Sequence, residues 1–197
     1  MKSAKVTAEA PTTRECADLV RGAAAGDQAS LDQLLRRARE VAGRFSYSVC
    51  GHSSDADDAV QVALISTYRN VGSIKDADAF RSWLYRTVRN ACLVSRRKRA
   101  GEPPHMESLD ESFAARRRNP EQLAEAADRR QDLRRALRAL PGSYREVLFL
   151  REVEGLSTRE VAAVTGISED NVKTRLRRAR ARLQLTLSGN PPHPSAH

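Results

Sequence analysis

The chain has 197 residues, with 34 Lys and Arg against 25 Asp and Glu, a formal net charge of +9 at pH 7 and a pI near 10.1. This charge favours a polyanionic partner such as nucleic acid. A membrane surface would attract the same charge, but the sequence has no apolar run of about eighteen residues, and Met1–Glu15 lacks the apolar core of a signal peptide. We therefore expect a soluble, cytoplasmic protein without membrane insertion.

The three cysteines, Cys16, Cys50 and Cys92, are far apart in the sequence and none belongs to a CxxC motif. Their odd number and wide spacing argue against a disulfide framework and against a zinc site. Single cysteines on helices are usually small core residues. We expect three reduced structural thiols and no redox sensor.

The first predicted elements follow a polar tail over residues 1–13. Apolar residues recur in helical phase over Arg14–Ala25, and Gly26 is expected to end this helix. A second helix is expected over Asp27–Gly43, continuing through Arg44–Gly51 to a break at Gly51–Ser54.

The next helix is predicted to begin at Ser54 or Asp55, in the sequence DADDAVQVALISTYRNV. Its apolar positions, from Ala56 to Tyr68, are expected to form one buried face. The opposite face then carries Asp55, Asp58 and Gln61. Such a face suits a basic partner, although an ordinary solvated face fits the same pattern.

Asp57 adds a third carboxylate to Asp55 and Asp58, so this helix start also allows a metal-site hypothesis. No histidine accompanies the three carboxylates, and Asp is ordinarily placed at a helix start because the helix dipole favours an anion there. We therefore expect no bound metal.

A loop is predicted over Ser73–Ala79, followed by a helix over Phe80–Arg99 that contains the single tryptophan, Trp83, near Tyr85 and among several arginines. Aromatic rings that stack on bases, with cations that hold phosphates, are typical of single-strand binding. The same pattern also fits core packing of the helix, and the periodicity leaves both interpretations open.

Prolines and mixed charge interrupt the periodicity over residues 101–122, which predicts a flexible linker. Helices are expected over Leu123–Leu140, with Leu133 and Leu140 in phase, and over Tyr144–Val153. They would pack on the elements that follow to make a second domain over residues 123–187. Residues 188–197 contain three prolines and are expected to be disordered.

The segment Leu156–Leu183 has the outline of a helix-turn-helix. Ser157 and Glu160 form a predicted capping box, Gly166 ends the first helix, and Ser168 caps the second. The inward face of the second helix would comprise Val172, Leu176, Ala179 and Leu183. The remaining positions of this helix are mostly cationic, which makes DNA binding the preferred interpretation.

Three motif blocks together resemble a bacterial sigma factor of the extracytoplasmic-function (ECF) group: DADDAVQ, FRSWLYRTVRN, and the block from LPGSYREV to RRARARL. The resemblance spans Asp18–Leu187. It implies an all-α protein with two small helical domains, residues 14–100 and 123–187, joined by the linker. The sequence contains no nucleophile–base pair, phosphate-binding loop or metal-ligand cluster, so we expect neither catalysis nor a cofactor.

The resemblance implies that RNA polymerase core is a partner. The clamp helices of the largest subunit would contact Asp55, Asp58 and Gln61, and the flap of the second-largest subunit would be a further contact. Val62 departs from the family pattern, which commonly has Glu at this position.

The resemblance also implies recognition and melting of the minus-ten promoter element, with a base of the non-template strand turned into a pocket edged by the predicted loop. Val94 departs from the pattern, which often has Asp there. The implied residues are Ser73, Ile74, Lys75, Asp76, Trp83, Arg86, Arg89, Asn90, Arg96 and Arg97.

The second helix of the helix-turn-helix would read the minus-thirty-five element. The implied residues are Ser168, Glu169, Asn171, Lys173, Thr174, Arg175, Arg177 and Arg178, with Arg175, Arg178 and Arg182 directed mainly to phosphates. The family also implies an anti-sigma factor that covers the polymerase-binding surfaces, which could hold the chain near the membrane.

Two other functions remain as alternatives. One is a helix-turn-helix regulator that binds duplex operators without polymerase. The other is a metal-dependent nucleic-acid enzyme that uses Asp55, Asp57 and Asp58.

Overall fold

A computed structural model describes residues 13–50, 53–98 and 131–188, and these residues form helices and turns without a strand. The chain divides into two compact units, Met1–Pro103 and Pro104–His197. Residues 1–12 and 189–197 of the predicted tails, the predicted linker and the first part of the helix expected from Leu123 lie outside the described residues. Within the described ranges no helix is long and apolar enough to span a membrane.

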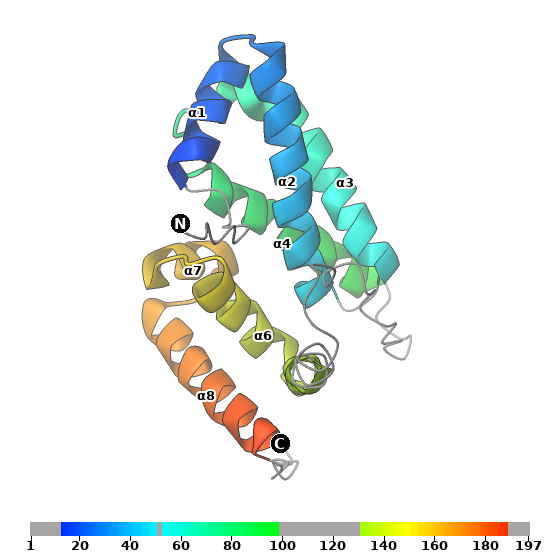
Figure 1. Ribbon diagram of the computed structural model, residues 1–197, viewed down its shortest axis with the longest axis vertical. Helices are drawn as coiled ribbons and strands as arrows, with labels where there is room; N and C mark the ends of the chain where they lie inside the picture. The colour runs from blue at the N-terminus through cyan, green and yellow to red at the C-terminus, as the bar shows by residue number, and fades with distance from the viewer. Residues whose placement is uncertain (1–12, 51–52, 99–130, 189–197) are drawn as a thin grey trace, which may run out of the picture. The chain divides into compact units, whose positions relative to one another are not determined.

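The first unit is built around its longest helix. Its elements are α1 (Thr13–Ala24), α2 (Gln28–Val49), α3 (Ser53–Asn70), the short helix η1 (Val71–Ser73) and α4 (Phe80–Lys98). Helix α2 packs against α1, α3 and α4 (Figure 1). Its apolar stripe, which includes Leu34, Ala38 and Phe45, supplies the centre of the core.

A turn and a cap set the start of α2. Gly26 has φ +91°, a left-handed conformation that glycine adopts without steric cost. The Asp27 side chain then accepts hydrogen bonds from the backbone N–H groups of Ala29 (3.4 Å) and Ser30 (3.0 Å). The hydrogen bonds from Ser30, its hydroxyl first, lower the pKa of the Asp27 carboxyl. The predicted helix start is confirmed.

Two aromatic residues lie where the sequence did not place them. Tyr85 is fully buried, with its ring 5.0 Å from that of Phe45 in an edge-to-face arrangement, so it is not available to stack on a base. Tyr68 was expected in the buried face of α3 but is 63% exposed. At 100° per residue it lies about 100° around the helix from the buried Thr67, outside the buried arc.

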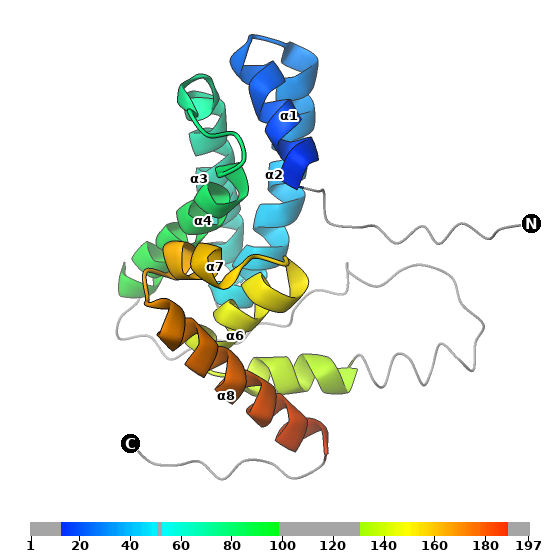
Figure 2. The same cartoon turned by 90° about the vertical axis from the view of Figure 1, so that its left-hand side faces the viewer.

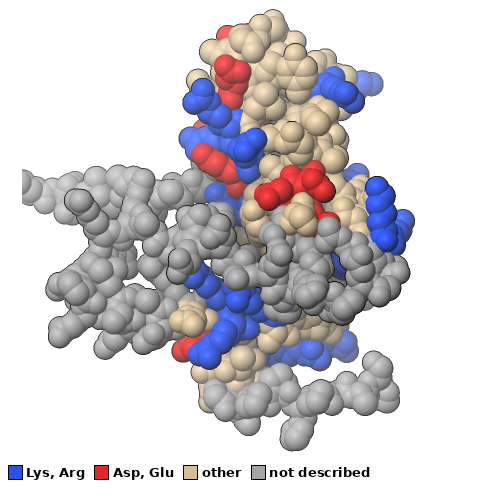
Figure 3. All heavy atoms as spheres, turned by 90° about the vertical axis from the view of Figure 1, so that its right-hand side faces the viewer, with Lys and Arg blue, Asp and Glu red and all other residues tan. Residues whose placement is uncertain are grey.

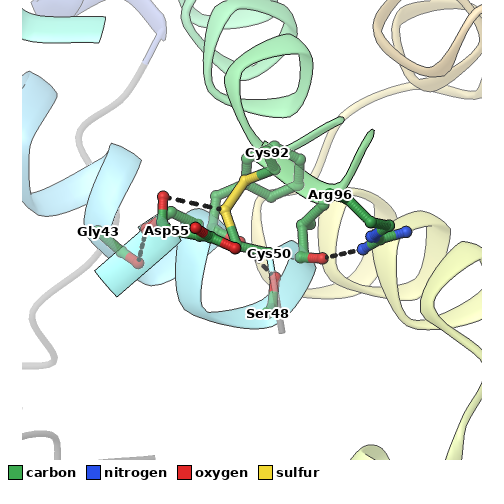
Figure 4. The surroundings of a disulfide bond; sticks show 9 residues. Gly43, Ser48, Cys50, Asp55, Cys92 and Arg96 are labelled. Carbon is green, nitrogen blue, oxygen red and sulfur yellow. Dashed lines mark hydrogen bonds between the residues drawn. A yellow bond between two sulfur atoms is a disulfide. The ribbon is translucent and has the colours of Figure 1, made fainter. Parts of the chain in front are cut away.

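The expectation of three reduced cysteines is wrong for two of them. Cys50 and Cys92 form a disulfide, with their Cα atoms 4.8 Å apart, although 42 residues separate them in sequence (Figure 4). Packing of the end of α2 against α4 brings them together. Cys16 remains a buried free thiol, and burial raises its pKa.

The second unit contains a helix over residues 131–139, α6 (Gly142–Leu148), the π-helical turn η3 (Phe149–Val153), α7 (Thr158–Thr165) and α8 (Glu169–Leu187). Helix α6 packs on α8 and α7 packs on both α8 and η3. Val147, Leu150, Val161 and Val172 are fully buried or nearly so. Leu133, which was expected in phase with the core, is 43% exposed.

Candidate nucleic-acid interface

The predicted helix-turn-helix is confirmed in its local geometry (Figure 2). The Ser157 hydroxyl accepts from the Glu160 N–H (3.2 Å), and the Glu160 carboxylate accepts from the Ser157 N–H (2.7 Å). Gly166 ends α7 at φ +69°, and the Ser168 hydroxyl accepts from the Asn171 N–H (3.3 Å) at the start of α8. The two caps and the glycine turn fix where α8 begins.

Helix α8 keeps one apolar side inward and presents polar side chains elsewhere. Val172, Leu176 and Ala179 are buried, and Leu183 is half-buried. Thr174 and Arg175 are half-buried. The other residues predicted to face DNA are exposed: Ser168, Glu169, Asn171, Lys173, Arg177 and Arg178.

The cations of α8 are not equivalent. Arg180 forms an ion pair with Glu152 of η3, and the Arg182 guanidinium lies 5.3 Å from the centre of the Tyr144 ring. In the described part of the chain, Arg177 and Arg178 have no ion-pair partner. The C-terminal half of α8 therefore uses its arginines within the unit, while Arg177 and Arg178 are available to a polyanion. Figure 3 shows Lys and Arg side chains gathered on one face of this unit.

A groove of about 610 Å³ lies along α3 and α4. It contains Asp58 and Gln61, expected to contact polymerase, together with Asn90, expected to contact DNA. The structure therefore brings two separately predicted sites onto one surface. Figure 3 shows an acidic patch on the first unit with basic groups around it.

The sequence analysis did not predict that apolar side chains from two helices lie together in this groove. Val62, Ile65 and Val94 line it and are 44–49% exposed. The signal was present in the sequence, because Val62 and Val94 are the two positions that depart from the family pattern. Only the packing of α3 beside α4 shows that these two departures fall in the same groove.

Asp55 does not belong to the exposed polar face that the sequence predicted. It is 4% exposed, whereas Asp58 and Gln61 are exposed. At 100° per residue Asp55 lies only about 40° from the buried Ala59, but about 120° from Gln61. The end of α2 packs beside it, and its backbone carbonyl oxygen lies 3.6 Å from Cys50 Sγ (Figure 4).

The carboxylate of Asp57, also at the start of α3, accepts a hydrogen bond from the Tyr47 hydroxyl at 2.9 Å. Asp55, Asp57 and Asp58 therefore do not point to a common centre. No group of three His, Cys, Asp or Glu side chains within residues 13–50, 53–98 and 131–188 could hold a metal ion.

The loop after η1 edges a pocket of about 360 Å³. The predicted residues Ile74, Lys75 and Asp76 line it, together with Val20 and Arg21 of α1. Asp76 accepts from the backbone N–H groups of the two residues before α4, at 3.0 and 3.3 Å, which fixes the shape of the loop. The α1 wall had no signal in the sequence, because α1 shows only the periodicity of a core helix.

Ser73 and the predicted DNA residues of α4 have different surroundings. The Ser73 hydroxyl donates to the Asn70 carbonyl (2.9 Å). Trp83 is half-buried and stacks on Phe80, with 5.9 Å between ring centres. Arg96 donates to the Val49 carbonyl. On the same helix Arg89 is half-buried, and the exposed positions are Arg86, Asn90, Arg96 and Arg97.

Comparison with known proteins identifies both units. Residues 31–102 match the family "Sigma-70 region 2", and residues 130–183 match "Sigma-70, region 4". The ECF RNA polymerase sigma factor SigM of Mycobacterium tuberculosis is 37% identical over 174 residues, which cover 88% of this chain and 85% of the relative. The ECF RNA polymerase sigma-E factor of Escherichia coli (strain K12) is 34% identical over 167 residues, which cover 79% of this chain and 85% of the relative.

The fold of this chain is also similar to that of a sigma factor of known structure. The sigma factor RpoE of Bartonella quintana, in complex with the anti-sigma factor NepR, aligns with a TM-score of 0.59 and 26% identity, covering 80% of this chain and 96% of that one. The two family regions also fall in the order in which the motif blocks were found. The chain belongs to the ECF group of RNA polymerase sigma factors.

Proposed function

We propose that this chain binds RNA polymerase core, places it on promoters by reading the minus-thirty-five and minus-ten elements, and promotes melting of the promoter. The observation that supports this proposal best is the groove on α3 and α4, because it joins Asp58 and Gln61 to Asn90 on one exposed surface. A regulator that acted without polymerase would need only the helix-turn-helix.

The polymerase-binding surface that we propose is the exposed side of α3, represented by Asp58 and Gln61 and extended by Val62 and Ile65. Exposed carboxylate and amide groups beside a half-exposed apolar strip match the usual make-up of a protein interface, with an apolar centre and a polar rim. We assign Asp55 a different role, because a buried carboxylate at the helix start cannot touch a partner directly.

The minus-ten surface that we propose comprises the pocket beside Asp76 and the outer side of α4. A base turned out of the non-template strand would enter the pocket, where Lys75 is placed for its phosphates, while Arg21 of the α1 wall forms an ion pair with Asp18. The exposed part of the Trp83 ring would stack on a base, while Arg86 and Arg97, which are exposed, would hold the phosphates of the strand.

The minus-thirty-five surface that we propose is the N-terminal half of α8. A recognition helix presents its N-terminal residues to base edges in the major groove. Asn171, Lys173 and Arg177 are exposed there, and Arg178 extends toward the neighbouring phosphates. Arg180 and Arg182 hold α8 in position within the unit. This assigns the minus-ten element to residues 14–100 and the minus-thirty-five element to residues 123–187.

We further propose that an anti-sigma protein regulates the chain by covering the α3 surface, and that it separates or clamps the two domains across the linker. The support is the solved complex of a similar sigma factor with NepR. Isolation of the protein from its native cell with polymerase alone, and never with a small inhibitor, would contradict this part of the proposal.

The function is tested by run-off transcription with purified core polymerase on native genomic fragments, comparing the wild type with D58R and R177A. We expect discrete start sites when core and the wild-type chain are combined and none with core alone, and weaker initiation from the same sites with each variant. Tight duplex binding without initiation at any fragment would overturn the proposal in favour of a polymerase-independent regulator.

A further inference from the structure

The Cys50–Cys92 pair occupies a junction between three helices of the first unit (Figure 4). Cys50 is the C-cap residue of α2, and Cys92 lies within α4. The two side chains are 3% and 1% exposed. Their Cα separation of 4.8 Å falls in the range in which two cysteines can be bonded without movement of the backbone.

The surroundings of the pair connect it to both proposed binding surfaces. Cys50 Sγ lies 3.6 Å from the Asp55 carbonyl oxygen, at the start of the helix that carries Asp58. One turn beyond Cys92, Arg96 donates a 2.7 Å hydrogen bond to the carbonyl of Val49, the residue before Cys50. A change at the two sulfur atoms therefore acts directly on the contacts that position α3 against α4.

A protein that works with RNA polymerase works beside the chromosome, in a compartment where thiol reductants keep most cysteines reduced. Disulfides that form in such compartments are usually transient and serve catalysis or redox sensing. Two buried cysteines at bonding distance in this setting are therefore better explained by a reversible bond than by a permanent one.

We propose that Cys50 and Cys92 are a redox-modified pair, oxidised by a low-molecular-weight disulfide, and that their oxidation strengthens the binding of polymerase core by fixing the start of α3. This inference rests on the proposed function.

The reaction is two thiol–disulfide exchanges. The Cys50 thiolate attacks one sulfur of the small disulfide RSSR, forming a mixed disulfide and releasing RS⁻. The Cys92 thiolate then attacks the Cys50 sulfur, forms the Cys50–Cys92 bond and releases the second RS⁻. The two thiol protons leave with the two RS⁻ groups as RSH, so the protein loses two electrons and RSSR gains them.

Cys50 is the sulfur that reacts first, because of its place in the fold. Helix ends open at a lower free energy than helix interiors, and Cys50 ends α2 whereas Cys92 lies inside α4.

The coupling to polymerase follows from close packing. When the bond is reduced, the two sulfur atoms must move apart to van der Waals distance in a site that has almost no exposed surface. A packed interior transmits such a movement to its neighbours instead of absorbing it. The start of α3 then loses part of its preorganisation, and ordering it again on binding costs affinity.

The test uses the full-length wild-type protein equilibrated in buffers of defined ratios of small thiol to small disulfide. Thiol trapping followed by peptide mass spectrometry measures which cysteines are bonded, and fluorescence anisotropy measures affinity for core polymerase in each buffer. We expect a Cys50–Cys92 crosslink with Cys16 still free, and core binding about fivefold tighter in the oxidised form. The double variant C50S/C92S should bind with one affinity in every buffer, while C16S should respond as the wild type does.

Three results would overturn the inference. The first is absence of the Cys50–Cys92 crosslink at every ratio. The second is equal core affinity of the crosslinked and reduced wild type, which overturns the switch and leaves the proposed function intact. The third is absence of core binding in both forms, which overturns the proposed function and the switch with it. The wild-type comparison needs no variant, so a folding defect in C50S/C92S does not weaken the test.

Discussion

Arg96 reaches across 47 residues of sequence to donate a 2.7 Å hydrogen bond to the backbone carbonyl of Val49. The acceptor lies in the last turn of α2, where carbonyl groups lack helical partners. Arg96 therefore holds α4 on α2, in addition to the contact with minus-ten DNA that the family resemblance implies for it. Arg97, the next residue, is exposed and has no ion-pair partner within the described residues.

The first prediction separates these two arginines. R96A should lower the free energy of unfolding by about 1 kcal/mol, because it removes a charged donor from a partly buried carbonyl. R97A should change stability by less than about 0.5 kcal/mol, as an exposed substitution does. Urea denaturation measures both. Equal stability of the two variants would show that the Arg96 hydrogen bond contributes nothing in solution.

The second prediction concerns the polymerase surface. D58R reverses a charge at the edge of the α3–α4 groove and should weaken core binding about tenfold, because it places a like charge against a basic partner. D32R makes the same charge change at an exposed position on α2, outside the groove, and should bind as the wild type does. Titration of labelled protein with core measures both affinities. An equal loss in the two variants would point to net charge instead of the groove.

The third prediction distinguishes base reading from phosphate holding on α8. R178A should weaken binding to all duplex sequences alike and reduce the slope of log affinity against log salt by about 0.9, the value for one phosphate contact. R177A should instead cost about 1–3 kcal/mol on the preferred minus-thirty-five sequence and less on mismatched ones. Salt titrations on matched and mismatched duplexes provide the readout, and identical behaviour of the variants would refute the division.

The fourth prediction concerns the cap that sets the start of α7. S157A removes the acceptor of the Glu160 N–H, and loss of such a cap typically costs about 1 kcal/mol. R159A alters an exposed residue of the same helix and serves as the control, with an expected change below about 0.5 kcal/mol. Thermal denaturation followed by circular dichroism checks both. A neutral S157A would mean that water satisfies this helix end equally well.

The fifth prediction is a pH dependence at the start of α2. The Ser30 hydroxyl and N–H lower the pKa of the Asp27 carboxyl in the folded protein below its value in the unfolded chain. The carboxylate therefore adds stability that is fully present above the unfolded pKa, about 3.9, and is lost as pH falls through the lower folded pKa. The stability difference between wild type and D27N should be constant near neutral pH and should shrink in acid. A difference that does not change on acidification would contradict this assignment.

The local features of the helix-turn-helix could be predicted because they depend on short-range chemistry. A capping box needs Ser157 and Glu160 three residues apart, and a left-handed helix end needs a residue such as Gly166. The inward positions of α8 follow from helical periodicity, which is also local. The family resemblance depended on the order of such local blocks, and the matches to regions 2 and 4 of sigma-70 support it.

Tertiary structure decided the features that depend on which helices meet. Asp55 and Asp58 are equivalent in the sequence pattern, but the end of α2 covers only Asp55. Trp83 and Tyr85 are two residues apart and so point to different sides of α4, where Phe45 buries only Tyr85. Val62 and Val94 are far apart in sequence, and only the packing of α3 beside α4 places them in one groove.

The sequence by itself determined the helices, their caps and the family, since each depends on residues within a few turns of one another. The bonding of Cys50 to Cys92 shows what it could not determine. Their spacing in sequence gave no reason to pair them, because the distance between two side chains from different helices depends on how the whole core packs. Only the tertiary structure placed the two sulfur atoms together, beside the start of the helix that we propose binds polymerase.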